Sequence, residues 1–368
     1  MRVLFLPFLQ IPSGHHHVAD CIQTQLEQIH KDCHCEKVDI FSYSYGKIEN
    51  WASSLYLQWI HRFPRLYSSI YRTAAVKEMK RNKRFYMYEL LFLHFIKDLL
   101  KEKNPDVVIC THALPSYMLV RLKKLNMWSG LLINAYTDYF INNLWGMEGV
   151  DYHFVPSKKV KDHLIKQGIK AQSIFITGIP VHPLFKSQHE KVIKDQLYTA
   201  LISGGNMGAG SISKLLERLH PAGKIRYKVL CGKNHRLYQY MKDFNHPLVQ
   251  PLPFISSKGK MNHLYNETDL IITKPGGVTI SESLVKKLPI FIYDVLPGQE
   301  EQNLQFLKNK GLVYHLDGWK VQENVEEEIW NILHHQKHNM THAIQQYLEE
   351  IELEDPASLI IEKIKSGR

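Results

Sequence analysis

The chain has 368 residues, which is long enough for two domains of roughly 150–200 residues each. Hydrophobic residues make up 44% and charged residues 22%, a composition that is typical of a globular protein and excludes a largely disordered one. The 46 Lys and Arg residues exceed the 36 Asp and Glu residues, and the formal net charge of +10 favours an anionic partner such as nucleic acid, a membrane surface or a phosphorylated substrate.

The N-terminal segment and the cysteines indicate a cytoplasmic protein. No run reaches the roughly 18–20 apolar residues that span a bilayer, and residues 3–6 are expected to form a buried first strand, because Pro7 ends the apolar run too early for a signal peptide. Five scattered cysteines favour neither a disulfide framework nor a structural zinc site. Residues 33–35 (Cys-His-Cys) could take a metal, but a second ligand pair is missing, and a surface turn is predicted there.

Short apolar runs alternate with longer helical patterns along the whole chain. The runs are nearly continuous, which is typical of parallel strands covered on both faces. This rhythm predicts an α/β fold with two doubly wound domains. The predicted strands are residues 3–6, 107–110, 131–135, 152–155, 173–177, 199–203, 227–231, 269–273 and 289–293.

The centre of the chain carries the clearest domain boundary. A glycine and two prolines follow the strand at 173–177, and a polar stretch precedes the next strand. We therefore expect a first domain at 1–180, a linker at 181–196, a second domain at 197–340 and C-terminal helices at 341–368. Asp355-Pro356 predicts the start of the last helix, with a capping carboxylate followed by proline at the first helical position.

More than half of the net charge lies between Trp51 and Phe95. This stretch has eight basic residues against two acidic ones, Glu78 and Glu89, together with eleven aromatic residues. The mixture fits a helical layer with aromatic residues in the core, a nucleic-acid surface, or a membrane-surface patch in which tryptophans such as Trp51 and Trp59 lie at the lipid interface. The basic residues are Arg62, Arg65, Arg72, Lys77, Lys80, Arg81, Lys83 and Arg84.

Three glycine turns stand where a strand should lead into a helix. They occupy residues 12–17, 204–210 and 274–279, each after a predicted strand. Glycines at such a turn allow backbone N–H groups to approach a ligand, and the positive end of the following helix favours an anion. The two turns of the second domain therefore predict a site suited to a diphosphate.

The third turn and its sequel, TKPGGVTISESLVKKLPIFIYDVLPGQEEQN (273–303), resemble the donor-binding segment of family 28 glycosyltransferases. The likeness is greatest to bacterial processive diacylglycerol glucosyltransferases and plant monogalactosyldiacylglycerol synthases, and more distant to the enzyme that adds N-acetylglucosamine to lipid I. Further motifs match in the family's order, so the likeness covers nearly the whole chain. They are SGH (13–15), AYTDY (135–139), TGIPVHP (177–183), LISGGNMGAG (201–210) and VLCGKN (229–234).

The resemblance implies the GT-B architecture, in which two Rossmann-like domains face a cleft, the second holds a UDP-sugar and the last helix returns to the first domain. It implies an inverting transfer of a hexose from UDP to a lipid hydroxyl, that of diacylglycerol or a glycosylated form of it, without metal or other cofactor. It also favours the membrane reading of residues 51–95 and a peripheral location on the inner face of the cell membrane, with no nucleic-acid partner.

The resemblance also assigns donor-binding roles to residues of this chain. A single carboxylate can accept hydrogen bonds from both ribose hydroxyls, and the resemblance assigns this role to Glu282. Phe254 and Ile255 are expected beside the uracil. The residues expected at the diphosphate are His182, Gly204, Gly205, Asn206, Gly276 and Gly277, and those expected at the transferred sugar are Gln299, Glu300 and Asn303.

The acceptor hydroxyl needs a base, because it must lose its proton as the sugar–phosphate bond breaks. By resemblance His15 is the first candidate and Asp138 the second. The three adjacent histidines at 15–17 also fit a solvated loop or a weak metal site.

Two positions depart from the family pattern. Pro12 stands where members usually have a glycine, which stiffens the first turn, and His182 stands where they have an arginine. Imidazole is mostly neutral at pH 7, so phosphate binding by His182 would be weaker than by a guanidinium, pH-dependent, or shared with another cation.

Rival functions share the same fold. They are a glycosyltransferase with another lipid-linked or soluble acceptor, a non-catalytic UDP-sugar-binding protein, and a nucleotide-sugar epimerase. Gluco and galacto donors differ only in the orientation of one hydroxyl, and the sequence does not separate them.

Overall fold

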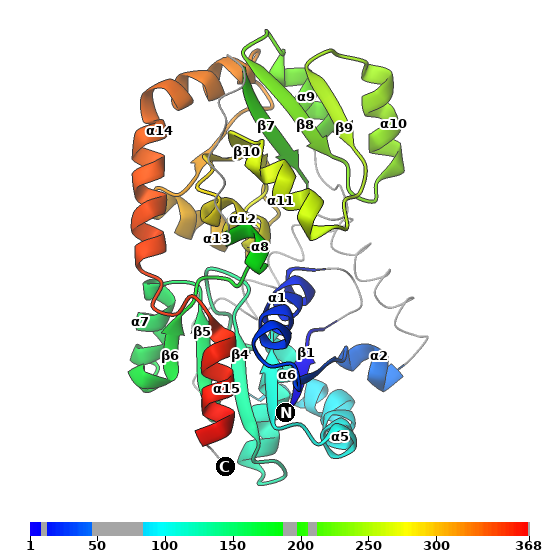
Figure 1. Cartoon of the computed structure of the whole chain (residues 1–368), viewed down its shortest axis with the longest axis vertical. Helices are drawn as coiled ribbons and strands as arrows, with labels where there is room; N and C mark the ends of the chain where they lie inside the picture. Colours follow the sequence, from blue (N-terminus) through cyan, green and yellow to red (C-terminus); the bar gives the residue numbers. More distant parts are fainter. Residues whose placement is uncertain (9–12, 46–83, 187–196, 205–211, 367–368) are drawn as a thin grey trace. The chain divides into compact units, whose positions relative to one another are not determined.

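The computed structural model describes residues 1–8, 13–45, 84–186, 197–204 and 212–366. It consists of two compact units, one formed by Met1–Pro180 with Glu350–Arg368 and the other by Val181–Glu349 (Figure 1). Each unit is built on a six-stranded parallel sheet. The α/β class and the doubly wound organisation predicted from the sequence are therefore confirmed.

The N-terminal unit has the strand order β2-β1-β3-β4-β5-β6, so the order reverses between β1 and β3. Its strands are β1 (Arg2–Leu6), β2 (His34–Lys37), β3 (Val107–Cys110), β4 (Leu131–Ala135), β5 (Tyr152–Val155) and β6 (Ile174–Ile176). Its helices are α1 (Gly14–Ile29), α2 (Ile40–Tyr45), α5 (Tyr86–Lys103), α6 (Ala113–Lys124), α7 (Lys158–Lys166), the short 3₁₀ helix η2 (Ala171–Ser173) and α15 (Pro356–Ser366).

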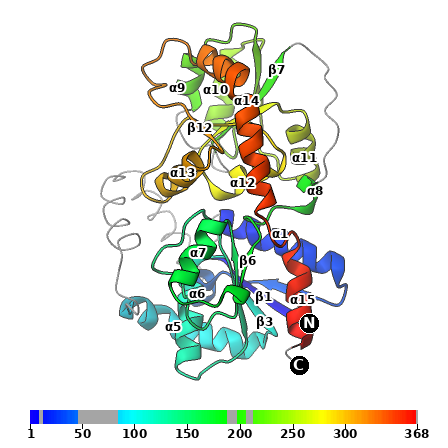
Figure 2. The same cartoon turned by 90° about the vertical axis from the view of Figure 1, so that its left-hand side faces the viewer.

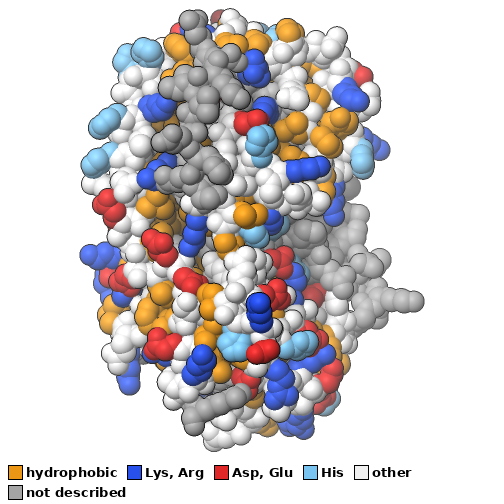
Figure 3. All heavy atoms as spheres, in the orientation of Figure 1, with side chains coloured by type: hydrophobic (Ala, Val, Ile, Leu, Met, Phe, Trp, Pro, Cys, Tyr) orange, Lys and Arg blue, Asp and Glu red, His pale blue; other side chains and the backbone are white. Residues whose placement is uncertain are grey.

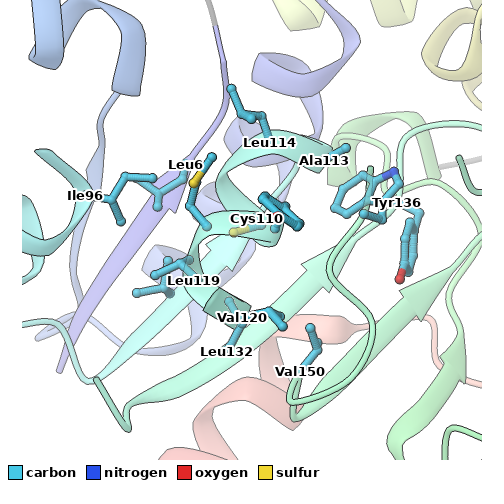
Figure 4. Packing of buried hydrophobic residues seen from close by; sticks show 14 of the residues in the cluster. Leu6, Ile96, Cys110, Ala113, Leu114, Leu119, Val120, Leu132, Tyr136 and Val150 are labelled. Carbon is cyan, nitrogen blue, oxygen red and sulfur yellow. The ribbon is translucent and has the colours of Figure 1, made fainter. Parts of the chain in front are cut away.

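Alternate residues of each strand face opposite layers of helices. Leu4 and Leu6 of β1 join a buried cluster with α5 and α6, to which Cys110 and Leu132 also belong (Figure 4). Helices α1 and α15 pack against each other and lie on the opposite side of the strands from α5 and α6 (Figure 2). Both faces of the sheet are covered, which explains why its central strands read as continuous apolar runs.

The last helix begins where Asp355-Pro356 predicts. Asp355 Oδ1 accepts a hydrogen bond from the Ala357 amide at 3.1 Å, and Oδ2 accepts one from the Ser358 hydroxyl at 2.6 Å. Ile360 and Ile364 of α15 are buried. Before it, Glu352 accepts hydrogen bonds from Lys161 Nζ at 2.7 Å and from the Ile176 amide at 3.2 Å, which fastens the returning chain to β6 of the N-terminal unit.

The C-terminal unit has the order β12-β11-β10-β7-β8-β9, which reverses between β7 and β10. Its strands are β7 (Tyr198–Ser203), β8 (Ile225–Leu230), β9 (Val249–Leu252), β10 (Leu270–Thr273), β11 (Ile290–Ile292) and β12 (Tyr314–His315). Its helices are α8 (Pro183–Lys186), α9 (Ile212–Leu219), α10 (His235–Phe244), α11 (Lys258–Asn266), α12 (Gly277–Val285), α13 (Gln299–Asn309) and α14 (Val325–Glu349).

Two predicted features differ in the structure. The boundary expected at residue 340 falls inside α14, and the chain passes to the N-terminal unit only after Glu349. The turn expected at residues 33–35 occupies residues 31–32, while Cys35 lies in β2. The strand escaped prediction because β2 lies at a sheet edge, where its polar residues stay partly exposed. No helix among the described residues is long and apolar enough to span a bilayer.

Candidate functional site

In the N-terminal unit, three neighbouring strand ends bring polar side chains together. His15 follows β1 in the first turn of α1, Thr111 and His112 follow β3, and Thr137 with Asp138 follow β4. Strands β1 and β3 flank the point where the strand order reverses. Doubly wound folds bind ligands beyond the carboxyl ends of their strands at such a point.

The contacts of Nδ1 show which ring nitrogen of His15 carries the proton. Nδ1 lies 2.7 Å from the Thr111 carbonyl oxygen. A carbonyl can only accept, so Nδ1 is protonated, and the lone pair of the neutral ring is on Nε2. The Thr137 hydroxyl oxygen, 3.0 Å from the same Nδ1, also accepts, and its own proton points to Asp138 Oδ2 at 3.5 Å. The arrangement presents Nε2 as a proton acceptor.

The surroundings keep His15 neutral at physiological pH. Burial lowers the pKa of His15 below its usual value, and the negative charge of Asp138 offsets part of that effect. Asp138, the second candidate base, therefore lies within electrostatic reach of the first. The structure brings these two predicted residues together.

His112 belongs to the same cluster and was not predicted. Its ring meets that of His15 edge to face at 4.7 Å and stacks on Phe8 at 4.9 Å. Its Nδ1 accepts the Leu114 amide at 3.2 Å as the cap of α6, and burial lowers its pKa strongly, so the ring is neutral. Its place directly after a predicted strand, at 107–110, is the signal that could have identified it.

In the C-terminal unit the order of strands reverses between β7 and β10, and a glycine turn follows each of them. Gly204 lies after β7 and is buried, while Gly205 and Asn206 lie outside the described residues. Gly276 caps α12, and Gly277 is its first residue. A Cβ at Gly276 would meet no atom within 4 Å, and φ is −78°. Neither packing nor backbone conformation requires glycine here, whereas close approach of a ligand would.

Glu282 lies in the second turn of α12 and is 8% exposed. Its Oε2 accepts a hydrogen bond from the Tyr265 hydroxyl of α11 at 2.8 Å. Burial raises the pKa of Glu282, against the smaller opposing effects of Lys258 and of this hydrogen bond. A buried carboxylate whose pKa is raised because few groups compensate its negative charge is common at functional sites.

The residues expected at the sugar lie at the start of α13. Glu300 Oε2 accepts from the Leu296 amide at 2.6 Å, which holds the preceding loop, and Gln299 is partly exposed beside it. Asn303 is 1% exposed, and its side-chain amide donates to the Pro275 carbonyl at 3.1 Å. Asn303 thus holds the glycine turn before α12, a contact that the sequence analysis did not predict.

His182 and the predicted uracil pair lie in the same unit, His182 directly before α8 and the pair after β9. His182 Nδ1 accepts from the Leu184 amide at 3.3 Å, and burial, followed by the charge of Lys258, lowers its pKa. Phe254 and Ile255 follow β9, the edge strand three positions from β10, which corresponds to about 14 Å across the sheet. Phe254 is 44% exposed, and Lys233 Nζ lies 5.4 Å from its ring centroid.

The basic segment lies mostly outside the described residues, and this includes Trp51, Trp59, Arg62, Arg65, Arg72, Lys80, Arg81 and Lys83. Arg84 is described, and it is paired with Glu89 at 2.5 Å and lies 4.2 Å from the Tyr86 ring centroid. Within the fold, the guanidinium of Arg84 thus pairs with a buried carboxylate, a contact that the sequence analysis did not predict. On the face of the N-terminal unit drawn in Figure 3, acidic side chains lie among the basic ones.

The described residues contain no group of three or more His, Cys, Asp or Glu side chains placed to hold a metal ion. Cys33 and Cys35 approach each other, with 3.5 Å between their sulfur atoms, and burial raises the pKa of both thiols.

Comparison with known sequences matches both halves of the chain. The family model for monogalactosyldiacylglycerol synthase matches residues 15–181, and that for the glycosyltransferase family 28 C-terminal domain matches residues 199–357. The glycosyltransferase YkoN of Bacillus subtilis, described as uncharacterized, is 49% identical over 326 residues, covering 88% of this chain and 87% of that protein. A processive diacylglycerol β-glucosyltransferase of Bacillus pumilus is 25% identical over 304 residues, covering 79% of this chain and 76% of the relative.

Comparison with solved structures identifies the fold. The MurG structure of Acinetobacter baumannii superposes with a TM-score of 0.63 at 14% identity, covering 100% of both chains. A putative UDP-N-acetylglucosamine 2-epimerase of Listeria monocytogenes gives a TM-score of 0.58 at 14% identity, covering 100% of this chain and 96% of the other. The two Rossmann-like units are those of the GT-B architecture, as the sequence implied.

Proposed function

Because this chain belongs to the family 28 glycosyltransferases, we propose that it transfers a hexose from a UDP-sugar to a lipid hydroxyl with inversion at the anomeric carbon. The observation that carries the proposal is the pairing of His15 Nδ1 with the Thr111 carbonyl, which leaves Nε2 of a neutral imidazole as the proton acceptor. The acceptor is diacylglycerol or a glycosylated diacylglycerol, in keeping with the relatives named as diacylglycerol glucosyltransferases.

His15 is proposed as the general base. The acceptor oxygen attacks the anomeric carbon from the face opposite the diphosphate, its proton passes to Nε2 of His15, and the bond from the anomeric carbon to the phosphate oxygen breaks. The resulting imidazolium keeps its Nδ1 proton on the Thr111 carbonyl, and the charge of Asp138 stabilises it. A neutral imidazole that can take up a proton is suited to this transfer.

The start of α12 is proposed to bind the leaving diphosphate. Backbone N–H groups at the N-terminus of a helix are directed at an anion, and the helix dipole favours negative charge there. Gly276, with open space where its Cβ would lie, permits that approach. In this scheme the helix supplies the stabilisation, no metal ion or other cofactor takes part, and Glu282 accepts the ribose hydroxyls while Gln299 and Glu300 bind the sugar.

The first turns of α5 are proposed to contact the membrane that supplies the lipid. Tyr86, Met87 and Leu90 are 65%, 68% and 86% exposed, and Leu91 is exposed beside them, so their helical spacing forms one apolar stripe. The basic stretch 51–83 precedes this stripe in the sequence. Basic groups attract anionic headgroups and exposed apolar side chains enter the interface, which fits peripheral attachment to the inner face of the cell membrane.

The central experiment feeds a panel of UDP-sugars to the protein with vesicles that contain diacylglycerol and analyses the lipids by mass spectrometry. We expect glycosylated lipid from one or more UDP-hexoses. The His15→Ala variant should lose about 10²–10⁴-fold in turnover while its affinity for UDP stays within twofold. Undiminished turnover would exclude His15 as the base.

The same assay separates the rival functions. Consumption of UDP-sugar without any lipid, with a change of configuration in the sugar, would indicate an epimerase. Binding of UDP-sugar without turnover of any acceptor would indicate a binding protein. Transfer to an acceptor other than diacylglycerol would keep the chemistry and change the substrate.

A second experiment tests the membrane surface. Leu90→Glu should weaken binding to anionic vesicles, because it places a charge on the proposed apolar stripe. Val321→Glu is the matched control, since Val321 is 82% exposed in the C-terminal unit and outside the stripe. Equal vesicle binding by both variants would contradict the proposed contact.

A further inference from the structure

Lys258 lies among residues that the sequence analysis assigned to the donor, although it was not itself assigned a role. It is the first residue of α11, whose N-terminus Ser257 caps by accepting the Lys260 amide at 3.3 Å. Its Nζ lies 5.8 Å from the ring centroid of Phe185. Helix α11 packs on α8, and α8 packs on α12, which carries Glu282.

A cluster of rings connects Lys258 to both predicted donor residues. Phe185 is fully buried, and its ring lies 6.0 Å from that of His182 and 5.6 Å from that of Tyr265. The Tyr265 hydroxyl in turn donates to Glu282 at 2.8 Å. His182 and Glu282 are thus two ends of one packed group, with the lysine beside its central ring.

Charge at this cluster comes from the lysine and not from the histidine. Burial and the positive charge of Lys258 both lower the pKa of His182, so its imidazole is neutral at pH 7. Its Nδ1 accepts the Leu184 amide, so the ring presents only a neutral Nε2–H. The charge of Lys258 also reaches Glu282, where it partly opposes the effect of burial on the pKa of that carboxyl.

Another lysine of the region is engaged elsewhere. Lys274, in the turn before α12, is buried, and its Nζ lies 3.6 Å from Asp294 Oδ2. A nucleoside diphosphate with its ribose on Glu282 would bring about two or three negative charges into the neighbourhood of Lys258, whose charge already acts on Glu282. An ammonium group with three donors can meet phosphate oxygens there.

We propose that Lys258 is the cation that binds the diphosphate of the donor nucleotide. It would take the role of the arginine that family members have at the position of His182. The inference rests on the proposed function, because it takes the ligand to be a UDP-sugar. In this proposal an ammonium group supplies the positive charge that the neutral imidazole of His182 does not.

The test compares three ligands that share the nucleoside but differ in charge: uridine, UMP and UDP. Calorimetry at pH 7.5 should show that Lys258→Gln weakens UDP binding about 10–100-fold and leaves uridine binding within twofold. Lys260→Gln is the matched control, because Lys260 lies two residues away on the same helix and is exposed; it should bind all three ligands like the wild type. Lys258→Arg, which keeps the charge, should retain UDP binding within about fivefold.

Each result decides between binding and structural roles. If Lys258→Gln weakens uridine as much as UDP, the lysine only positions Glu282, and the inference is wrong. If UDP binding is unchanged in a variant that melts like the wild type, it is also wrong. If Lys258→Gln does not fold, Lys258→Met, which keeps an apolar stem beside Phe185, replaces it in the same comparison of UDP with uridine. Wild-type protein that binds none of the three ligands would overturn the proposed function, and the inference with it.

Discussion

Two buried glutamates, one in each unit, have opposite surroundings. Glu89 of α5 and Glu282 of α12 are both 8% exposed. Glu89 receives hydrogen bonds from Arg84 and the Tyr117 hydroxyl at 2.5 Å each and an ion pair from Arg121 at 3.2 Å. The pKa of Glu89 is lowered, first by the hydrogen bond from Arg84, whereas burial raises that of Glu282. The two side chains thus have the same exposed fraction, but the negative charge of Glu89 is met by cationic and hydroxyl partners, whereas that of Glu282 is only partly compensated.

The difference separates a carboxylate with partners within the fold, Glu89, from the carboxylate that we propose binds the ribose, Glu282. Burying a charge is costly unless partners replace its hydration. Glu89 has those partners within the chain, and it joins the start of α5 to α6. Glu282 has one neutral hydroxyl donor and a lysine at longer range, so ribose hydroxyls would complete its coordination.

The largest expected effect is on stability. Glu89→Ala leaves Arg84, Arg121 and Tyr117 without their shared acceptor and should lower the free energy of unfolding by about 3 kcal/mol, measured by urea denaturation. Affinity for UDP at a temperature where the variant is folded should stay within twofold. Lys101→Ala, at an exposed position of the same helix, is the control and should unfold like the wild type. Loss of UDP affinity with unchanged stability would reverse the assignment.

Glu282→Ala should do the opposite. Loss of an ionised acceptor for ribose should weaken UDP binding by about 2 kcal/mol, roughly 30-fold, with little change in the free energy of unfolding. The wild type should bind 2′,3′-dideoxyuridine diphosphate about as weakly as the variant binds UDP. If the variant discriminates between UDP and the dideoxy compound as the wild type does, Glu282 does not contact the ribose.

Acidification should affect the two units in sequence. The raised pKa of Glu282 means that it takes up a proton at a pH above 4.5, so uridine affinity should fall there as the acceptor becomes neutral. The lowered pKa of Glu89 means that its contribution to stability is present above 4.5 and is lost only as the pH falls further. Uridine is the ligand of choice because it has no titrating phosphate. Glu282→Gln should bind it with a flat pH profile, and a matching fall in that variant would exclude Glu282 as the titrating group.

The smallest effects come from single hydroxyls. Tyr117→Phe removes a donor to Glu89 and should cost about 1 kcal/mol of stability with unchanged binding. Tyr265→Phe removes the donor to Glu282, so the pKa of Glu282 should rise further. The fall in uridine affinity on acidification should then begin at a higher pH than in the wild type, while stability changes little. Thermal melting and calorimetry on the same two variants measure both quantities. A stability loss confined to Tyr265→Phe would contradict the comparison.

The central strands could be predicted, whereas of the four edge strands only β6 was, as residues 173–177. Strands such as β3 and β10 are covered on both faces, so their residues are apolar throughout and the sequence locates them within two residues. Strands β2, β9 and β12 lie at sheet edges. On the outer side of an edge strand, the backbone N–H and C=O groups have no neighbouring strand to pair with. Polar residues, or a proline such as Pro251 that lacks an N–H group, are therefore tolerated there.

The donor side was more predictable than the acceptor side because its residues are close together in the sequence. The segment 273–303 contains a strand end, the glycine turn, Glu282 and the start of α13. His15 lies 96 residues from Thr111 and 122 residues from Thr137 along the chain. The parallel sheet brings the three together, and the oxygen atoms that contact Nδ1 of His15 come from the residues that follow β3 and β4. Such contacts leave no local pattern.

The sequence alone determined the two doubly wound domains, the positions of the glycine turns and the family, because apolar runs and a contiguous motif are local properties. The net charge of +10 suggested an anionic partner, but only the tertiary structure showed that Arg84 is used by Glu89 and that Lys258 lies beside His182 and Glu282. It also decided which glutamate is compensated and which nitrogen of His15 accepts a proton. Those properties depend on how deeply each side chain is buried and on partners that come from distant strands. Neither can be read from the order of the residues, because both arise only when the sheet forms.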